Sequence, residues 1–232
     1  MLYYPAPNPD AKRARVFTRH DFLHSLKVAS ITRQAERNQL LICMSHGCGL
    51  RVTELSQIEV QDMLFVSGVA RSEVSLRAAI TKGCRQRCIY VTHKQTIAAL
   101  ERYLTFRIKH GLGTELTAER YRGLSPSTAL ILTHKGSKFY LNTKRRKNFA
   151  GERVDYLACD SLQARITDVY QKAGIKQGSS HSGRRSFASN LLHNGASLDT
   201  VRQLLGHSEL NHIMPYLEVR PEKLRQMFED AI

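Results

Sequence analysis

The chain has 232 residues, 42% of them hydrophobic, and this is enough to bury one sizeable core. It carries 35 lysines and arginines against 20 acidic residues, a formal net charge of +15. A surplus of this size favours a polyanion as partner, with nucleic acid ahead of a membrane surface. The longest apolar run, Leu40 to Met44, is far too short to cross a bilayer, so we expect no membrane partner.

The N-terminus and the cysteines point to an intracellular protein. The chain begins MLYYPAPNPDAKRAR, with prolines where a signal peptide needs an apolar stretch. We therefore expect a cytoplasmic protein whose residues 1–16 form a basic, flexible arm. Five cysteines without a CxxC pair favour reduced thiols over disulfides or a zinc site. The motifs GxxxxGK[ST], HExxH and GxSxG do not occur, so we expect no cofactor and no metal.

Helical signals dominate the first half of the chain. Thr18, followed three residues later by Asp21, is typical of a helix N-cap. A second helix carries the apolar residues 40–44 and stops at the glycines of HGCGL, and Arg51 opens a third, RVTELSQI. Residues 95–109 are predicted to be helical as well.

A β-hairpin is predicted between the third of these helices and the helix at 95–109. Apolar and polar residues alternate from Glu73 to Ile80, which is the period of a half-buried strand. A turn at Lys82 and Gly83 returns the chain through CIYVT, so a lysine lies at the predicted tip. Beyond the helix at 95–109, AERYRGLSPST predicts a loop.

The segment 135–147 is strongly basic. It contains six lysines and arginines and no acid, with Phe139 and Tyr140 among them. It could be a solvated loop, as charge runs usually are, or it could contact a DNA backbone, and the two interpretations weigh equally. Its candidate DNA-contacting residues are Lys135, Lys138, Lys144, Arg145, Arg146 and Lys147.

The last third of the chain predicts several more helices. The first spans Ser161 to Gly174, and the stretch HSGRRSFASNLLHNGASLDTVRQLLGH that follows it predicts two short ones. Asn194 and Gly195 end the first of this pair, while Ser197 and Gly206 bound the second. After a break at a proline, residues 221–232 predict a final amphipathic helix.

Six polar residues follow one another in a specific order along these elements. They are Arg51 in GLRVTEL, Lys82 in ITKG, His181 and Arg184 in HxxR, His207 in LLGH, and Tyr216 nine residues later. The ordered set resembles the catalytic domain of the tyrosine recombinases, the phage-integrase family, over roughly residues 17–232. The resemblance implies an α+β fold, mainly helical with a small antiparallel sheet. It also implies site-specific cleavage and rejoining of DNA through a 3′-phosphotyrosine, for integration, excision or inversion of a DNA element.

The resemblance implies a role for each basic residue of the set. Arg51 and Arg184 would clamp the scissile phosphate, a task that suits arginine because its planar fork bonds two phosphate oxygens and keeps its charge. Lys82, on the hairpin, would be the general acid for the leaving 5′-oxygen. Arg185 is expected to be solvated or to contact the DNA backbone, without a catalytic role.

The remaining members of the set supply the nucleophile and its helpers. Tyr216 would attack the phosphate, and because the pKa of a free tyrosine is about 10 it needs a nearby base and cations. His181 would be that base. His207 would hydrogen-bond the phosphate and support the site.

The sequence departs from the family pattern in three places. Gly183 stands where the family commonly has an apolar residue, and Pro215 precedes the tyrosine where a helix-compatible residue is usual. Most members also carry a separate N-terminal core-binding domain, and only a short arm is found here. We therefore expect a catalytic domain by itself, with weaker and strongly salt-dependent DNA binding.

Partners and competing functions follow from the same resemblance. Double-stranded DNA is the expected partner, and residues 221–232 either dock on a neighbouring subunit, which builds a tetramer on paired sites, or pack on their own core. An accessory DNA-bending protein or a second recombinase could join the assembly, which would be associated with the nucleoid. The alternatives are a type IB topoisomerase, a catalytically silent DNA-binding regulator and an RNA-binding accessory protein, the last resting on charge alone.

Overall fold

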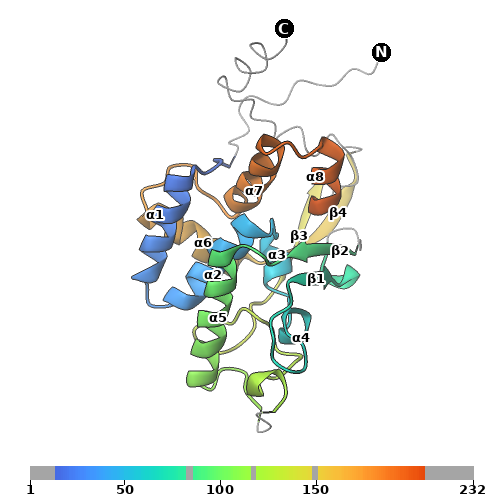
Figure 1. Ribbon diagram of the computed structural model, residues 1–232. Coiled ribbons are helices and arrows are strands. Elements are labelled where there is room, and N and C mark those ends of the chain that lie inside the picture. Colours follow the sequence, from blue (N-terminus) through green and yellow to red (C-terminus); the bar gives the residue numbers. More distant parts are fainter. Residues whose placement is uncertain (1–13, 82–85, 116–118, 148–150, 207–232) are drawn as a thin grey trace, which may run out of the picture.

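The computed structural model describes residues 14–81, 86–115, 119–147 and 151–206. Within these ranges the protein is mainly helical with short antiparallel strands, so the predicted α+β class is confirmed (Figure 1). The helices described are α1 (Arg19–Ser30), α2 (Ala35–Gly47), α3 (Val52–Leu55), α4 (Val60–Met63), α5 (Lys94–Lys109), α6 (Asp160–Lys172), α7 (Ser182–His193) and α8 (Leu198–Leu205). The strands described are β1 (Glu73–Leu76), β2 (Arg87–Tyr90), β3 (Asn142–Lys147) and β4 (Arg153–Ala158).

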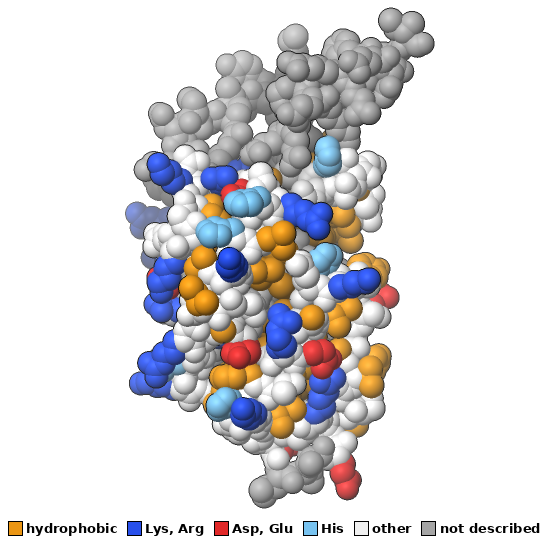
Figure 2. All heavy atoms as spheres, turned by 60° about the vertical axis from the view of Figure 1, so that its left-hand side comes forward, with side chains coloured by type: hydrophobic (Ala, Val, Ile, Leu, Met, Phe, Trp, Pro, Cys, Tyr) orange, Lys and Arg blue, Asp and Glu red, His pale blue; other side chains and the backbone are white. Residues whose placement is uncertain are grey.

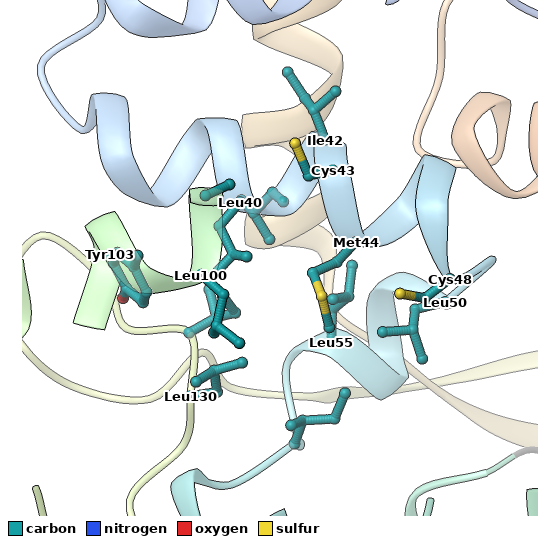
Figure 3. Close-up of a cluster of buried hydrophobic side chains, with 14 of the residues drawn as sticks. Leu40, Ile42, Cys43, Met44, Cys48, Leu50, Leu55, Leu100, Tyr103 and Leu130 are labelled. Carbon is teal, nitrogen blue, oxygen red and sulfur yellow. The ribbon is translucent and has the colours of Figure 1, made fainter. Parts of the chain in front are cut away.

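Helix α2 is the centre of the core. It packs against α1, α5, α6 and α7, and its apolar residues from Leu40 to Met44 are buried on every side of the helix. Figure 3 shows Leu40 and Met44 among Leu100 and Tyr103 of α5. The C-terminal end of α2 is therefore fixed in the core, and the chain runs from it directly towards Arg51.

Helices α7 and α8 pack on each other through a smaller apolar cluster. Ala188, Val201 and Leu205 are fully buried there, and Phe187 and Leu191 close over them. Because α7 also packs on α2, this cluster holds the end of α8 next to the segment that carries Arg51.

Among the described residues, none of the helices combines the length and the apolar content that crossing a membrane requires.

Most helix boundaries agree with the sequence prediction. Thr18 and Asp21 form the predicted reciprocal cap at the start of α1. The side chain of Ser197 accepts a hydrogen bond at the start of α8, and Gly206 ends that helix in the left-handed conformation, with φ of 63°. Local capping chemistry was enough to locate these ends.

The predicted hairpin forms, but its first strand is shorter than the alternation suggested. Strand β1 ends at Leu76, which pairs with Arg87 of β2, and Ala78–Ile80 form a 3-10 turn instead of the rest of the strand. The side chain of Arg77 turns back to Asp62 and bonds its carboxylate at 3.0 Å. The alternation in the sequence therefore continues past Leu76, where the pairing of the strand ends.

A second hairpin was not predicted. The second half of the basic segment, for which a solvated loop was one of two interpretations, is strand β3, and it pairs with β4 in antiparallel register, with Arg145 opposite Asp155. The residues of strand β3 are all polar or charged, so they carry no alternation of apolar and polar residues by which to recognise the strand. Their charges are also partly compensated, because Lys144 pairs with Asp160 at 2.6 Å and Arg145 with Asp155 at 2.7 Å.

Candidate active site

Arg51 occupies the N-cap position of α3, and its side chain is held by the helix that it starts. Its backbone N–H donates to Glu54 Oε2 at 2.7 Å, and its Nη1 donates to Glu54 Oε1 at 2.7 Å. The Glu54 carboxylate is fully buried. An acceptor with both oxygens engaged fixes the direction of the guanidinium as well as its position.

Arg184 lies in the first turn of α7 and is only 3% exposed. Its Nη1 donates to the carbonyl oxygen of Gly49 at 2.6 Å, and its Nη2 donates to that of Leu205 at 2.5 Å. The backbone can come this close because Gly49 has φ of +62° and a Cβ there would lie 2.5 Å from the ring of Phe187. The fork of Arg184 thus ties the segment before Arg51 to the end of α8.

The two arginines converge on one oxygen. Arg51 Nη2 also donates to the carbonyl of Leu205, at 3.3 Å. Leu205 is the last residue of α8, and a helix leaves its final carbonyls without intrahelical partners and with partial negative charge. Two guanidiniums that meet at one acceptor in a mostly buried position form the kind of site that binds an anionic oxygen.

Glu54 and Arg87 belong to this site, although the sequence analysis did not select them. Arg87 Nη2 donates to Glu54 Oε2 at 2.6 Å from the first position of β2. Burial raises the pKa of Glu54, but the cations of Arg87, Arg184 and Arg51 outweigh it and hold that pKa below its ordinary value. One carboxylate faces three guanidiniums, so the cluster keeps an excess of positive charge. The helical spacing from Arg51 could have indicated Glu54, whereas no local signal marks Arg87.

His181 is the N-cap residue of α7, and its side chain keeps an exposed surface. Partial desolvation, followed by the charges of Arg184 and Arg51, lowers its pKa from the ordinary 6.5. The neutral imidazole is therefore favoured at pH 7, and that form can accept a proton. The structure thus brings together the three described members of the predicted set, Arg51, Arg184 and His181.

Three members of the predicted set, Lys82, His207 and Tyr216, lie outside the described residues. His207 follows Gly206 in the sequence, two positions after the shared acceptor Leu205. Strand β2 contacts α8, and Arg87 of β2 donates to the carbonyl of Leu204 at 2.8 Å. The hairpin formed by β1 and β2 is therefore joined to the arginine cluster.

Arg185 corrects one expectation. It was expected to be solvated or to contact DNA, but it is only 6% exposed, and its Nη1 donates to the carbonyl oxygen of Ala14. Nearby, the backbone N–H of Phe17 donates to Ser186 Oγ at 2.8 Å. Arg185 therefore attaches the N-terminal segment to α7, including residues 14–16 of the expected arm.

The basic segment lies apart from the arginine cluster in sequence, but its hairpin contacts α3 through β4. The side chains of Lys135, Lys138, Lys144 and Arg145 are exposed. Arg146 and Lys147 belong to β3, and their side chains are not among those described. The exposed members are accessible for contact with an acidic partner.

Nothing in the described part of the chain gathers three or more His, Cys, Asp or Glu side chains as a metal site would. Burial raises the pKa of the Cys43 thiol, and that of Cys48, to about 12. Cys48 is packed in the core beside Leu50 (Figure 3). Such thiols act as small apolar side chains and are poor nucleophiles at neutral pH.

Comparisons with known proteins show to which family the chain belongs. The model of the phage integrase family matches residues 15–223. The chain is 29% identical over 197 residues to the tyrosine recombinase XerC of Myxococcus xanthus, and the aligned residues are 84% of this chain and 54% of that protein. It is 26% identical over 195 residues to the tyrosine recombinase XerA of Pyrococcus horikoshii, and the aligned residues are 84% of this chain and 55% of that protein. The chain thus spans about half the length of these curated relatives.

Solved structures share the fold. A crystal structure of XerA recombinase matches with a TM-score of 0.65 at 18% identity, covering 98% of this chain and 66% of the other. The XerH site-specific recombinase in a post-cleavage complex with palindromic difH substrate matches with a TM-score of 0.63 at 18% identity, covering 96% and 54%. With the family model matching from residue 15 to residue 223, the chain belongs to the phage integrase family.

Proposed function

We propose that the protein is a site-specific DNA recombinase that cleaves and rejoins DNA through a 3′-phosphotyrosine. The observation that carries the proposal is the convergence of Arg51 and Arg184 on the single carbonyl oxygen of Leu205, with His181 in their field. Membership of the family and relatives named tyrosine recombinases support it. Integration, excision and inversion of a DNA element are all outcomes of this chemistry.

The cleavage step needs negative charge to be stabilised on a five-coordinate phosphorus. Arg51 and Arg184 would donate to the non-bridging phosphate oxygens from the position that the Leu205 carbonyl marks. Their orientation is set in advance by Glu54 and by the carbonyl of Gly49, so little reorganisation is needed when charge develops.

Bond changes follow from the proposed roles. The Tyr216 oxygen bonds to phosphorus as the bond from phosphorus to the 5′-oxygen breaks. The phenolic proton passes to His181, whose lowered pKa keeps it neutral beforehand, and Lys82 supplies a proton to the 5′-oxygen. His207 would donate a hydrogen bond to the phosphate. Attack of a 5′-hydroxyl on the phosphotyrosine reverses these steps without an external energy source.

Double-stranded DNA is the proposed substrate and partner. The net charge of +15 and the exposed basic segment support it, and a solved XerH structure holds its difH substrate. The face of the molecule on the α1 side carries scattered lysine, arginine and histidine side chains and few acidic ones (Figure 2). We also propose assembly as a tetramer on paired sites through residues 221–232, aided by an accessory DNA-bending protein or a second recombinase, in the cytoplasm at the nucleoid.

The alternatives have less support. The relatives reported above are named tyrosine recombinases, and they give no support to a type IB topoisomerase or to a silent regulator. The ordered arrangement of Arg51, Arg184 and Glu54 also goes beyond what charge-driven binding of RNA or DNA would require.

Covalent trapping tests the proposal. Nicked DNA fragments from the sequences that flank the gene are incubated with the full chain, which is then denatured and searched for a protein–DNA adduct. We expect an adduct with the wild type and none with Tyr216→Phe, while Tyr140→Phe, at a tyrosine that is 71% exposed, should react normally. No adduct on DNA that the protein demonstrably binds, or an adduct that persists in Tyr216→Phe, contradicts the proposed reaction.

A further inference from the structure

Arg87 is a buried arginine that connects the hairpin of β1 and β2 to two other elements. It is the first residue of β2, and its side chain is only 4% exposed. Its Nη2 donates to Glu54 Oε2 of α3 at 2.6 Å, and its Nη1 donates to the carbonyl of Leu204 near the end of α8 at 2.8 Å. One guanidinium therefore joins three separate parts of the chain.

Both contacts of Arg87 reach supports of the proposed phosphate clamp. Glu54 is the carboxylate that holds the backbone and the guanidinium of Arg51. Leu204 precedes Leu205, whose carbonyl receives both Arg51 and Arg184. A shift of Arg87 would therefore move the acceptor on each side of the clamp.

We propose that Arg87 is a positioning residue that sets Arg51 through the Glu54 carboxylate and sets the end of α8 through the Leu204 carbonyl. This inference rests on the proposed recombinase function. Arg87 does not take part in the chemical step itself; it makes the two guanidiniums of the clamp face the same phosphate.

The geometry requires arginine at this position. The planar fork donates in two directions at once, whereas the ammonium of lysine is a point charge on a flexible stem. The space is also closed, since a Cβ on Gly206 would lie 2.9 Å from Arg87 Cδ. A lysine could reach Glu54 or the Leu204 carbonyl, but it could not hold both in the same geometry.

Arg87 also carries a cost for folding. Among the described residues, nothing accepts a hydrogen bond from its buried Nε. It shares Glu54 with Arg51, and burial lowers its own pKa although Glu54 raises it. A buried donor without a partner and a cluster of like charges both oppose stability. Such a residue is better explained by the orientation of the clamp than by folding alone.

Two variants and a matched control test the inference. Arg87→Met removes the fork at similar length, and Arg87→Lys keeps the charge. Arg122→Met is the control, because Arg122 likewise joins one carboxylate, Glu101, and one backbone carbonyl, that of Gly68, away from the site. All three are made in the full chain.

Hydrogen exchange measures positioning without relying on activity. In Arg87→Met we expect loss of amide protection in residues 51–58 and 198–206, with protection of α5 unchanged. Arg122→Met should leave both segments protected. If the two segments exchange no faster in Arg87→Met than in the control, Arg87 does not position them and the inference fails.

Single-turnover cleavage measures the consequence for catalysis. Misplacement of catalytic groups by about 1 Å costs on the order of 100-fold in rate, and we expect that loss in Arg87→Met, with DNA affinity as in the control. Arg87→Lys should recover only part of it. In a substrate with sulfur in place of the 5′-oxygen, the leaving thiolate needs no proton. This substrate should not restore the cleavage rate of Arg87→Met, because the defect lies in the clamp. Restoration by sulfur would place the defect at the general acid and overturn the inference.

The two hypotheses fail separately. A wild-type protein that binds DNA but forms no adduct contradicts the recombinase function, and hydrogen exchange still decides whether Arg87 positions the cluster. An active wild type whose Arg87→Met variant cleaves at the rate of Arg122→Met contradicts only the positioning role.

Discussion

Arg184 Nη2 donates to the carbonyl oxygen of Leu205 at 2.5 Å and thereby links the start of α7 to the end of α8. The contact satisfies a carbonyl that helix geometry leaves open, and it orients the other half of the fork towards Gly49. One side chain therefore contributes both to the packing of the two helices and to the geometry of the proposed site.

Replacing Arg184 by lysine should slow the reaction and destabilise the protein. An ammonium cannot hold the carbonyls of Gly49 and Leu205 and a phosphate in a planar array, so we expect cleavage to slow by about 100- to 1000-fold. A buried carbonyl that loses its hydrogen-bond donor should also lower the free energy of unfolding by about 1–3 kcal/mol. Single-turnover adduct formation and urea unfolding measure the two effects. Arg202→Lys, at an ion pair on α8 with Asp199, is the control, and equal rates for both variants would contradict the clamp.

The pH dependence of cleavage should report His181. A base must be neutral, and partial desolvation together with the charges of Arg184 and Arg51 lowers the pKa of His181 from 6.5. The rate should therefore hold as pH falls to 6.5 and drop only at lower pH, as the imidazole becomes protonated. Single-turnover rates over pH, with circular dichroism to exclude unfolding, check this. A midpoint above 6.5, or the same acid limb in His181→Gln, would show that another group is titrating.

Gly183→Ala should destabilise the protein. A Cβ at this position would lie 2.3 Å from Ser45 Oγ and 3.0 Å from His46 Cδ2, so α7 could not keep its distance from α2. Overpacking of this kind costs about 1–3 kcal/mol, which urea unfolding can measure. Adding Ser45→Gly should recover part of the loss, and a double variant no more stable than Gly183→Ala would locate the strain elsewhere. The close contact also explains why this chain has glycine in HSGRR.

The salt dependence of DNA binding should separate the two halves of the basic segment. Lys135 and Lys138 are exposed and have no described carboxylate partner, so replacing each by alanine should reduce the slope of log affinity against log salt by about 0.9. Lys144 and Arg145 are already paired with Asp160 and Asp155, so their replacement should change the slope less. Fluorescence anisotropy over a range of salt concentrations measures both. Equal changes for the two pairs would mean that the ion pairs open on DNA.

Local chemistry determined much of this protein from sequence alone. Capping residues such as Thr18 and Ser197 located helix starts because their hydrogen bonds reach only three residues along the chain. The ordered motifs identified Arg51, His181 and Arg184, and the structure brings them together. Such features depend on neighbours in sequence or on a fixed order, and both can be read without coordinates.

Tertiary structure alone decided how the site is supported. Arg87 meets Glu54 across 33 positions, and Arg51 meets Leu205 across 154, so neither contact leaves a periodic signal in the sequence. Burial of Arg185 was missed for the same reason, because the carbonyl of Ala14 that it binds lies 171 positions away. Side-chain type restricts which partners are chemically suitable, but only the packing of distant segments brings one of them within hydrogen-bond distance.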